Sequence, residues 1–130
     1  MILLGLVVLA VLVLRRGFVV VTVRGASMEP TFSDGDRVLA LRPWARRVRR
    51  GGVVVVDAPD LIGGLLIKRV FSVPGDDVPR ETFPALDGDT VPAGSVVLRG
   101  DNAAHSYDSA QAGYFPVSGI RGVVLRRMSD

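Results

Sequence analysis

The chain has 130 residues, 48% hydrophobic and 22% charged, which is enough for one domain with a modest core. It has no cysteine and one histidine, which excludes disulfides and thiolate sites and leaves too few soft ligands for a zinc centre, so we expect no metal and no cofactor. The net charge of +3 comes from arginine, because Lys68 is the single lysine among sixteen basic residues.

An uncharged apolar run, residues 1–14, begins the chain and ends at Arg15 and Arg16. It is shorter than the roughly 20 residues of a spanning helix. A cleaved signal peptide is the alternative, but no basic segment precedes the run and no small-residue cleavage site follows it. We expect residues 1–16 to be an N-terminal transmembrane anchor helix, shortened by a late start codon, and residues 17–130 to form one domain. The two arginines would keep their end of the anchor in the cytoplasm.

Short valine-rich runs between glycine and proline turns predict an all-β domain. We expect strands at 18–24, 37–41, 53–57, 65–73, 95–99 and 120–127. The longest irregular stretch, residues 77–92, is interpreted as an excursion between core strands. The basic segment "LRPWARRVRR" at 41–50 is interpreted as a solvated loop or one near anionic lipid headgroups, in preference to a nucleic-acid patch.

The first candidate for chemistry is Ser27, in "VRGASMEPTFSDGDRV". A valine-rich strand runs into Gly25 and Ala26, whose small size lets a substrate backbone approach, and Pro30 stiffens the exit. Such a turn can expose a hydroxyl beside free backbone N–H groups. An ordinary Ser-x-x-Pro turn is the structural alternative.

Lys68 is the second candidate, in the apolar run "LLIKRV". A buried lysine can lose its proton and act as a base, whereas arginine cannot. An edge-strand lysine that extends to water is the alternative. A serine–histidine–aspartate triad would have to use His105, and no "GxSxG" motif occurs.

The segments "SMEPT" with "GDRV", "KRVFSVPGD" and "GDNAAHSYDS" together resemble the ordered motifs of type I signal peptidases. These are serine–lysine membrane proteases that remove signal peptides from exported proteins. The similarity runs from about residue 21 to residue 124. It implies a coiled antiparallel β-sheet catalytic core over 17–130, in agreement with the strands expected above.

The resemblance also implies roles for individual residues. Ser27 would be the nucleophile, Lys68 its general base, and Ser106 the residue that orients the lysine amine within hydrogen-bond reach. Asp108 would brace the site through Arg69. The backbone N–H groups of Ser27 and beside Gly25 would hold the oxyanion. An extended substrate would lie along residues 21–24 and 65–67, with its small side chains in pockets lined by Val23, Phe32, Leu66 and Ile67.

The sequence departs from the family pattern at several positions. Ala110 stands where an arginine usually follows the last motif, and Gly52 replaces a common acid. Gly25 replaces a serine whose hydroxyl helps to bind the oxyanion in some members. The segment between "PGD" and "GDN" is short, so the accessory region of longer members is absent.

The expected protein is a single-pass plasma-membrane endopeptidase with its catalytic domain outside the cytoplasm, an orientation that the resemblance implies and that is opposite to the one Arg15 and Arg16 favour. Its partners would be membrane lipid and a precursor that carries a signal or leader peptide, and not nucleic acid. One alternative is a dedicated maturation protease for a single precursor. Another is a silent, membrane-tethered β-domain whose arginines bind acidic partners. A self-cleaving repressor is disfavoured because no helix-turn-helix precedes Ser27.

Overall fold

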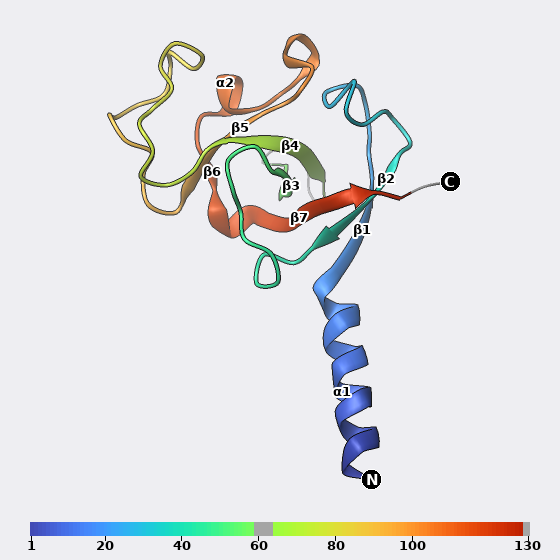
Figure 1. Cartoon of the computed structure of the whole chain (residues 1–130). Coiled ribbons are helices and arrows are strands. Elements are labelled where there is room, and N and C mark those ends of the chain that lie inside the picture. Colours follow the sequence, from blue (N-terminus) through green and yellow to red (C-terminus); the bar gives the residue numbers. More distant parts are fainter. Residues whose placement is uncertain (59–63, 129–130) are drawn as a thin grey trace.

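The computed structural model describes residues 1–58 and 64–128. Its secondary structure follows in chain order: α1 (Ile2–Gly17), β1 (Phe18–Thr22), β2 (Arg37–Leu41), β3 (Val53–Asp57), β4 (Leu65–Ser72), β5 (Ser95–Arg99), the 3₁₀ turn η1 (Ala103–His105), α2 (Ser109–Ala112), β6 (Phe115–Pro116), η2 (Val117–Gly119) and β7 (Ile120–Arg127). The strands form one curled antiparallel sheet in the order β1-β2-β7-β3-β4-β5-β6, with α1 projecting from it (Figure 1). The expectation of a mostly β domain is confirmed.

All six strands expected from the sequence form, each within two residues of its expected end. The valine-rich runs favour this outcome because β-branched side chains pack well on a pleated surface. The sequence did not predict β6, α2 or the two 3₁₀ turns. These elements are four residues long or shorter, which is too short to show a period in the sequence.

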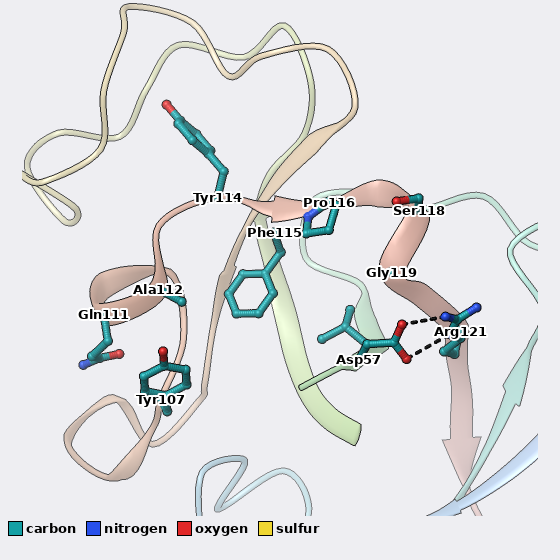
Figure 2. A pocket seen from close by; sticks show the side chains of 11 residues that line it. Asp57, Tyr107, Gln111, Ala112, Tyr114, Phe115, Pro116, Ser118, Gly119 and Arg121 are labelled. Carbon is teal, nitrogen blue, oxygen red and sulfur yellow. Dashed lines mark hydrogen bonds and ion pairs between the residues drawn. The ribbon is translucent and has the colours of Figure 1, made fainter. Parts of the chain in front are cut away.

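The centre of the sheet is β3, in which Val53, Val54, Val55 and Val56 are all buried. Strand β3 pairs with β4 on one side and with β7 on the other. At its end, Asp57 accepts two hydrogen bonds from the Arg121 guanidinium of β7, at 2.9 and 2.6 Å (Figure 2). Because alternate side chains of β3 point to opposite faces, two separate cores form on the two sides of the sheet.

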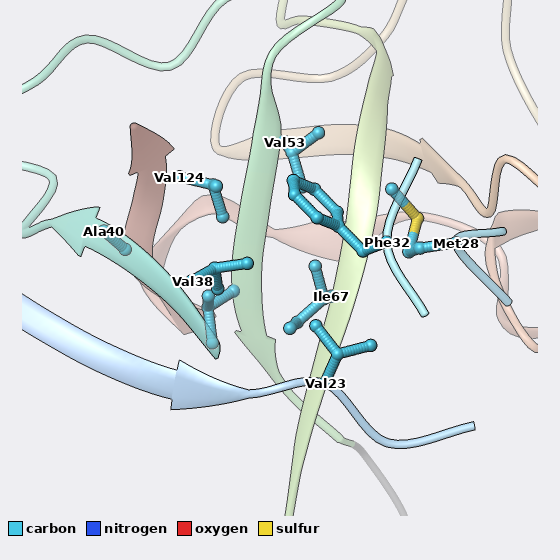
Figure 3. Close-up of a cluster of buried hydrophobic side chains, with 9 residues drawn as sticks. Val23, Met28, Phe32, Val38, Ala40, Val53, Ile67 and Val124 are labelled. Carbon is cyan, nitrogen blue, oxygen red and sulfur yellow. The ribbon is translucent and has the colours of Figure 1, made fainter. Parts of the chain in front are cut away.

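The first of these cores contains nine buried residues, among them Val23, Met28, Phe32 and Ile67 (Figure 3). Figure 3 shows the Phe32 ring pointing toward Val53, with Ile67 on β4 beneath it. This core brings the segment after β1 against the start of β4, the two parts of the chain that carry Ser27 and Lys68. A third small core, formed by Phe83, Leu86, Val91 and Val97, holds the excursion at 77–92 onto the sheet.

Helix α1 is confirmed as a helix over the expected apolar run, and its large apolar side chains from Ile2 to Leu14 that the structure describes are exposed. No helix in the described part of the chain has both the length and the apolar character needed to cross a membrane. The transmembrane anchor therefore stays a prediction.

Candidate active site

Ser27 lies in a tight turn after β1 that two other segments hold in place. Gly25 adopts a positive φ of 80°, a conformation that favours glycine, and its N–H donates to Asp34 Oδ1 at 2.7 Å. The backbone N–H of Asn102 donates to the Ser27 carbonyl at 2.8 Å, and Asn102 Nδ2 donates to the Ala26 carbonyl at 3.1 Å. The turn that presents Ser27 is thus attached to the loop after β5.

The Gly25 hydrogen bond bears on which N–H groups are available to an oxyanion. Its N–H is already donated to Asp34, so it does not add a free donor. The N–H groups of Ala26, Ser27 and Met28 donate no hydrogen bond to any of the described residues. Free N–H groups beside a nucleophile are the donors that a tetrahedral oxyanion requires, so Ala26 and Ser27 are the better candidates.

Lys68 is 2% exposed, which confirms the expectation that it is largely buried. It sits on β4 opposite Val54 of β3, and the buried Val70 lies two residues further along the same face of the strand. Burial lowers the pKa of the Lys68 ammonium below its usual value of 10.5, because the charged form loses its hydration. The negative charge of Asp108 opposes this shift and offsets part of it.

Ser106 and Asp108 lie on the loop after η1, and the charge of Asp108 acts on Lys68. The Ser106 hydroxyl donates to Asp108 Oδ2 at 2.8 Å, and the same oxygen accepts the Gly100 N–H at 2.8 Å. Asp108 Oδ1 accepts the Ala110 N–H, so this buried carboxylate also caps α2. Asp108 therefore fixes the Ser106 hydroxyl while its charge acts on Lys68.

The structure corrects the expected pairing of Asp108 with Arg69. Arg69 instead pairs with Asp101 through two hydrogen bonds of 2.7 Å, and Asp101 also accepts a hydrogen bond from Thr31. The reason is strand alternation, which puts Arg69 on the face opposite Lys68 and Asp108. Arg69 joins the segments that carry all three motifs, although it contacts a different acid from the one expected.

Gly100 lies close to both Ser106 and the Ser27 carbonyl. A methyl group at its Cα would lie 2.2 Å from Ser106 Oγ and 2.7 Å from the Ser27 carbonyl oxygen. No side chain larger than hydrogen fits between the two serine-bearing loops. No local sequence pattern indicates these contacts, because they are made with Ser27, a residue distant along the chain, and with Ser106 on the next loop.

Ser27 and Lys68 both line one cavity of about 190 Å³. Its walls are Val21, Thr22, Val23, Arg24, Ser27 and Met28 on one side and Leu65, Leu66, Ile67 and Lys68 on the other. Of the expected pocket residues, Val23, Leu66 and Ile67 line it, whereas Phe32 lies deeper, in the core beneath. Within the described ranges no hydrogen bond joins Lys68 to Ser27 or Ser106, and those contacts stay predictions.

The two walls of this cavity are strand edges with unpaired backbone. β1 is an end strand of the sheet, and β5 pairs with β4 only from Arg69 onward, so no strand within the described residues pairs with the outer edge at 65–68. Edges of this kind can accept an extended peptide by backbone hydrogen bonding. The geometry therefore suits a strand-shaped ligand whose backbone passes Ser27.

A larger cavity, of about 560 Å³, lies beside the first and was not expected from the sequence. Its lining includes Tyr107, Phe115, Pro116 and the Asp57–Arg121 pair (Figure 2). Val56 and Asp57 of β3 line this larger cavity, and their strand partners Leu66 and Leu65 of β4 line the smaller one. The two cavities are therefore next to the same residue pairs of β3 and β4. Among the described residues, no group of three histidine or acidic side chains is placed to hold a metal ion.

Comparison with known proteins agrees with these motifs. The model of the family "Signal peptidase, peptidase S26" matches residues 1–82 and 79–128. Mitochondrial inner membrane protease subunit 1 of Schizosaccharomyces pombe is 34% identical over 80% of this chain and 69% of its own length. Subunit 1 of the mouse enzyme is 36% identical over 82% of this chain and 66% of its own length. Signal peptidase I V of Bacillus subtilis is 29% identical over 91% of this chain and 90% of its own length.

Both the family match, which extends over nearly the whole chain, and the serine and lysine motifs at one cavity lead to the same assignment. The protein belongs to the signal peptidase family.

Proposed function

We propose that this protein is a serine endopeptidase that removes signal or leader peptides from precursor proteins by means of a Ser27–Lys68 dyad. The observation that carries the proposal is that one small cavity is lined by both residues and that Lys68 is buried there with a lowered pKa. A serine hydroxyl is a weak nucleophile unless a base removes its proton, and a lysine can be that base once its own pKa falls.

The proposed reaction is acyl transfer followed by hydrolysis. Neutral Lys68 takes the proton of the Ser27 hydroxyl as its oxygen attacks the scissile carbonyl carbon. The oxyanion is held by the free N–H groups of Ser27 and Ala26. Lys68 then gives the proton to the leaving amine, and a water molecule, deprotonated in the same way, releases the acyl group from Ser27. Ser106, held by Asp108, directs the lysine amine.

The proposed substrate is an extended peptide with small side chains next to the cut. Its backbone would pair with the open edges at 21–24 and 65–67. A cavity of about 190 Å³ divided among alternate side chains leaves room for small apolar groups only. Such residues are typical just before a signal-peptide cleavage site.

The proposed location is a membrane, with α1 as the tether. The exposed apolar side chains of α1 favour contact with lipid, and two relatives carry names of inner membrane proteases. A single-pass topology in the plasma membrane, with the catalytic domain outside the cytoplasm, is part of this proposal.

The test compares wild-type protein with Ser27→Ala and Ser33→Ala in cleavage of a detergent-extracted precursor. Ser33 is an exposed serine nearby whose hydroxyl takes part in no hydrogen bond among the described residues, so it is a matched control. We expect Ser27→Ala to remove cleavage and Ser33→Ala to retain it. Equal activity of wild type and Ser27→Ala would refute the proposed nucleophile. An inactive but folded wild type would favour a silent β-domain.

A further inference from the structure

The loop between β2 and β3, residues 42–52, is attached to the base of α1. The backbone N–H of Arg42 donates to the Gly17 carbonyl at 2.8 Å. Trp44 lies against Gly17, since a methyl group there would be 3.4 Å from the indole ring. The loop hangs on the side of the sheet from which α1 emerges (Figure 1). Trp44 is nevertheless 65% exposed, so most of this large apolar side chain lacks a protein partner.

Trp44 lies in a segment with five arginines and no acidic residue. Arg42, Arg46, Arg47, Arg49 and Arg50 are exposed, as are Arg15 and Arg16 at the end of α1. In the part of the chain that the structure describes, Arg50 is the one member of this set in an ion pair, with Asp76 at 3.4 Å. The arginines also line two surface cavities, of about 130 and 470 Å³.

We infer that the segment 42–50, here called the Trp44 loop, is a docking element for an anionic phospholipid bilayer. Three features fit this partner together: an exposed apolar helix, an exposed tryptophan at its base, and five exposed arginines in the same loop, of which, among the described residues, Arg50 alone is in an ion pair. Tryptophan favours the membrane interface, and arginine binds phosphate through paired N–H groups. A soluble acidic partner would account for the arginines and would leave the apolar helix exposed.

This inference deepens the proposed function, because it states how the catalytic domain is held against the membrane. With α1 inserted and the Trp44 loop at the headgroups, the domain has two contacts with the bilayer instead of one flexible tether. Two contacts restrict the rotation of the domain, so the cavity at Ser27 is kept at a defined orientation to a precursor that is itself in the membrane.

The chain contains one tryptophan, so the fluorescence of Trp44 reports on this loop without labelling. Vesicles of phosphatidylcholine, alone or mixed with phosphatidylglycerol, are titrated into the full chain. Trp44 emission and its quenching by acrylamide are recorded. We expect a blue shift and protection from acrylamide with the anionic vesicles, reduced at high salt, and little of either with phosphatidylcholine alone.

The variant is Arg46→Gln/Arg47→Gln, and the matched control is Arg80→Gln/Arg121→Gln, which removes the same charge from other surfaces. Each arginine near an anionic surface contributes about a fivefold factor, so the loop variant should need about 30-fold more anionic lipid for half of the shift. The control should titrate like wild type. Both double variants should cleave a soluble precursor peptide at the wild-type rate, which separates this inference from the protease proposal.

Three outcomes would overturn the inference. If the chain sediments with anionic vesicles while Trp44 stays open to acrylamide, then α1 binds the membrane and the loop does not. If Trp44 is protected by a soluble polyanion such as heparin and not by vesicles, the loop binds an acidic macromolecule. Identical titrations for the loop variant and its control would also contradict the role of Arg46 and Arg47.

Discussion

At the scale of single residues, the chemistry depends on the place of the one lysine of the chain. Lys68 is surrounded by apolar side chains of β3 and β4, and this burial lowers its pKa. An arginine at the same position would stay protonated and could accept no proton from Ser27. Under the proposed mechanism, lysine is required at this position for its proton affinity and not for its charge or size.

Lys68→Arg is expected to abolish most of the activity while it preserves charge and length. Losing a positioned general base costs about 10²- to 10⁴-fold in turnover. Wild-type turnover should rise with pH as Lys68 loses its proton, with an inflection below the ordinary pKa of 10.5. The measurement is precursor cleavage by folded protein across a pH series. More than about a tenth of wild-type turnover in the variant would be incompatible with a general base.

Gly100 gives a second prediction at this scale. In Gly100→Ala the new methyl group would overlap Ser106 and the Ser27 carbonyl, so the two loops must separate. We expect a loss of about 1–3 kcal/mol of unfolding free energy, typical of overpacking, together with a strong fall in turnover. Gly119→Ala is the control, because the nearest atom to its methyl group would be 3.6 Å away. Equal activity and stability of the two variants would mean that the loops are not in close contact.

At the scale of elements, one acid joins three segments. Asp101 follows β5, Arg69 belongs to β4, and Thr31 follows the Ser27 turn. The hydrogen bonds from Arg69 are the main reason that the pKa of Asp101 is lowered from 3.8. Asp101 and Arg69 therefore hold the loops of the site on the sheet, and among the described residues their side chains form no hydrogen bond with Ser27 or Lys68.

Asp101→Asn should lower stability and also loosen the site. Hydrogen bonds to charged groups contribute about 1.5–3 kcal/mol, and partial exposure of Arg69 reduces this, so we expect a loss of about 1–2 kcal/mol in urea unfolding. Because the folded pKa is lowered, the contribution is present above pH 3.8 and is lost as the pH falls through the lowered value. Asp89→Asn, at a fully exposed ion pair, should change little. Identical acid unfolding of wild type and Asp101→Asn would exclude this role.

At the scale of the whole molecule, the burial of Lys68 in the proposed active site reduces the stability of the fold. In the described ranges Lys68 forms no hydrogen bond or ion pair, although it is 2% exposed. A buried ammonium without a close partner disfavours folding, and its lowered pKa is the measure of this cost. Enzymes commonly accept such a loss of stability where the chemistry requires a perturbed group.

Lys68→Met should therefore be inactive and more stable than wild type, by about 0.5–2 kcal/mol in urea unfolding. The sign of the pH dependence follows from the lowered pKa. The unfolded chain holds the lysine proton more tightly, so wild-type stability rises with pH up to about the ordinary value of 10.5. The difference in unfolding free energy between Lys68→Met and wild type should therefore shrink as the pH rises toward 10.5. Lys68→Arg, which keeps the charge buried, should show no gain, and a destabilised Lys68→Met would contradict the argument.

The sequence by itself determined the strands and singled out the two side chains that are proposed to react. The valine-rich runs at 37–41 and 53–57 are local patterns, and a strand depends mainly on the alternation and shape of its own side chains. Ser27 and Lys68 stood out because each has an unusual neighbourhood in the chain: small residues before a turn in one case and apolar residues around a lone lysine in the other.

The tertiary structure alone decided how these parts meet. Arg69 pairs with Asp101 and not with Asp108, because strand alternation sends Arg69 and Lys68 to opposite faces. The Gly25 N–H is donated to Asp34, and Phe32 lies in the core instead of the cavity wall. The contact of the Trp44 loop with α1 joins segments more than twenty residues apart. Each of these outcomes depends on how the sheet curls and on where its registers shift at the bulges, which no local pattern encodes.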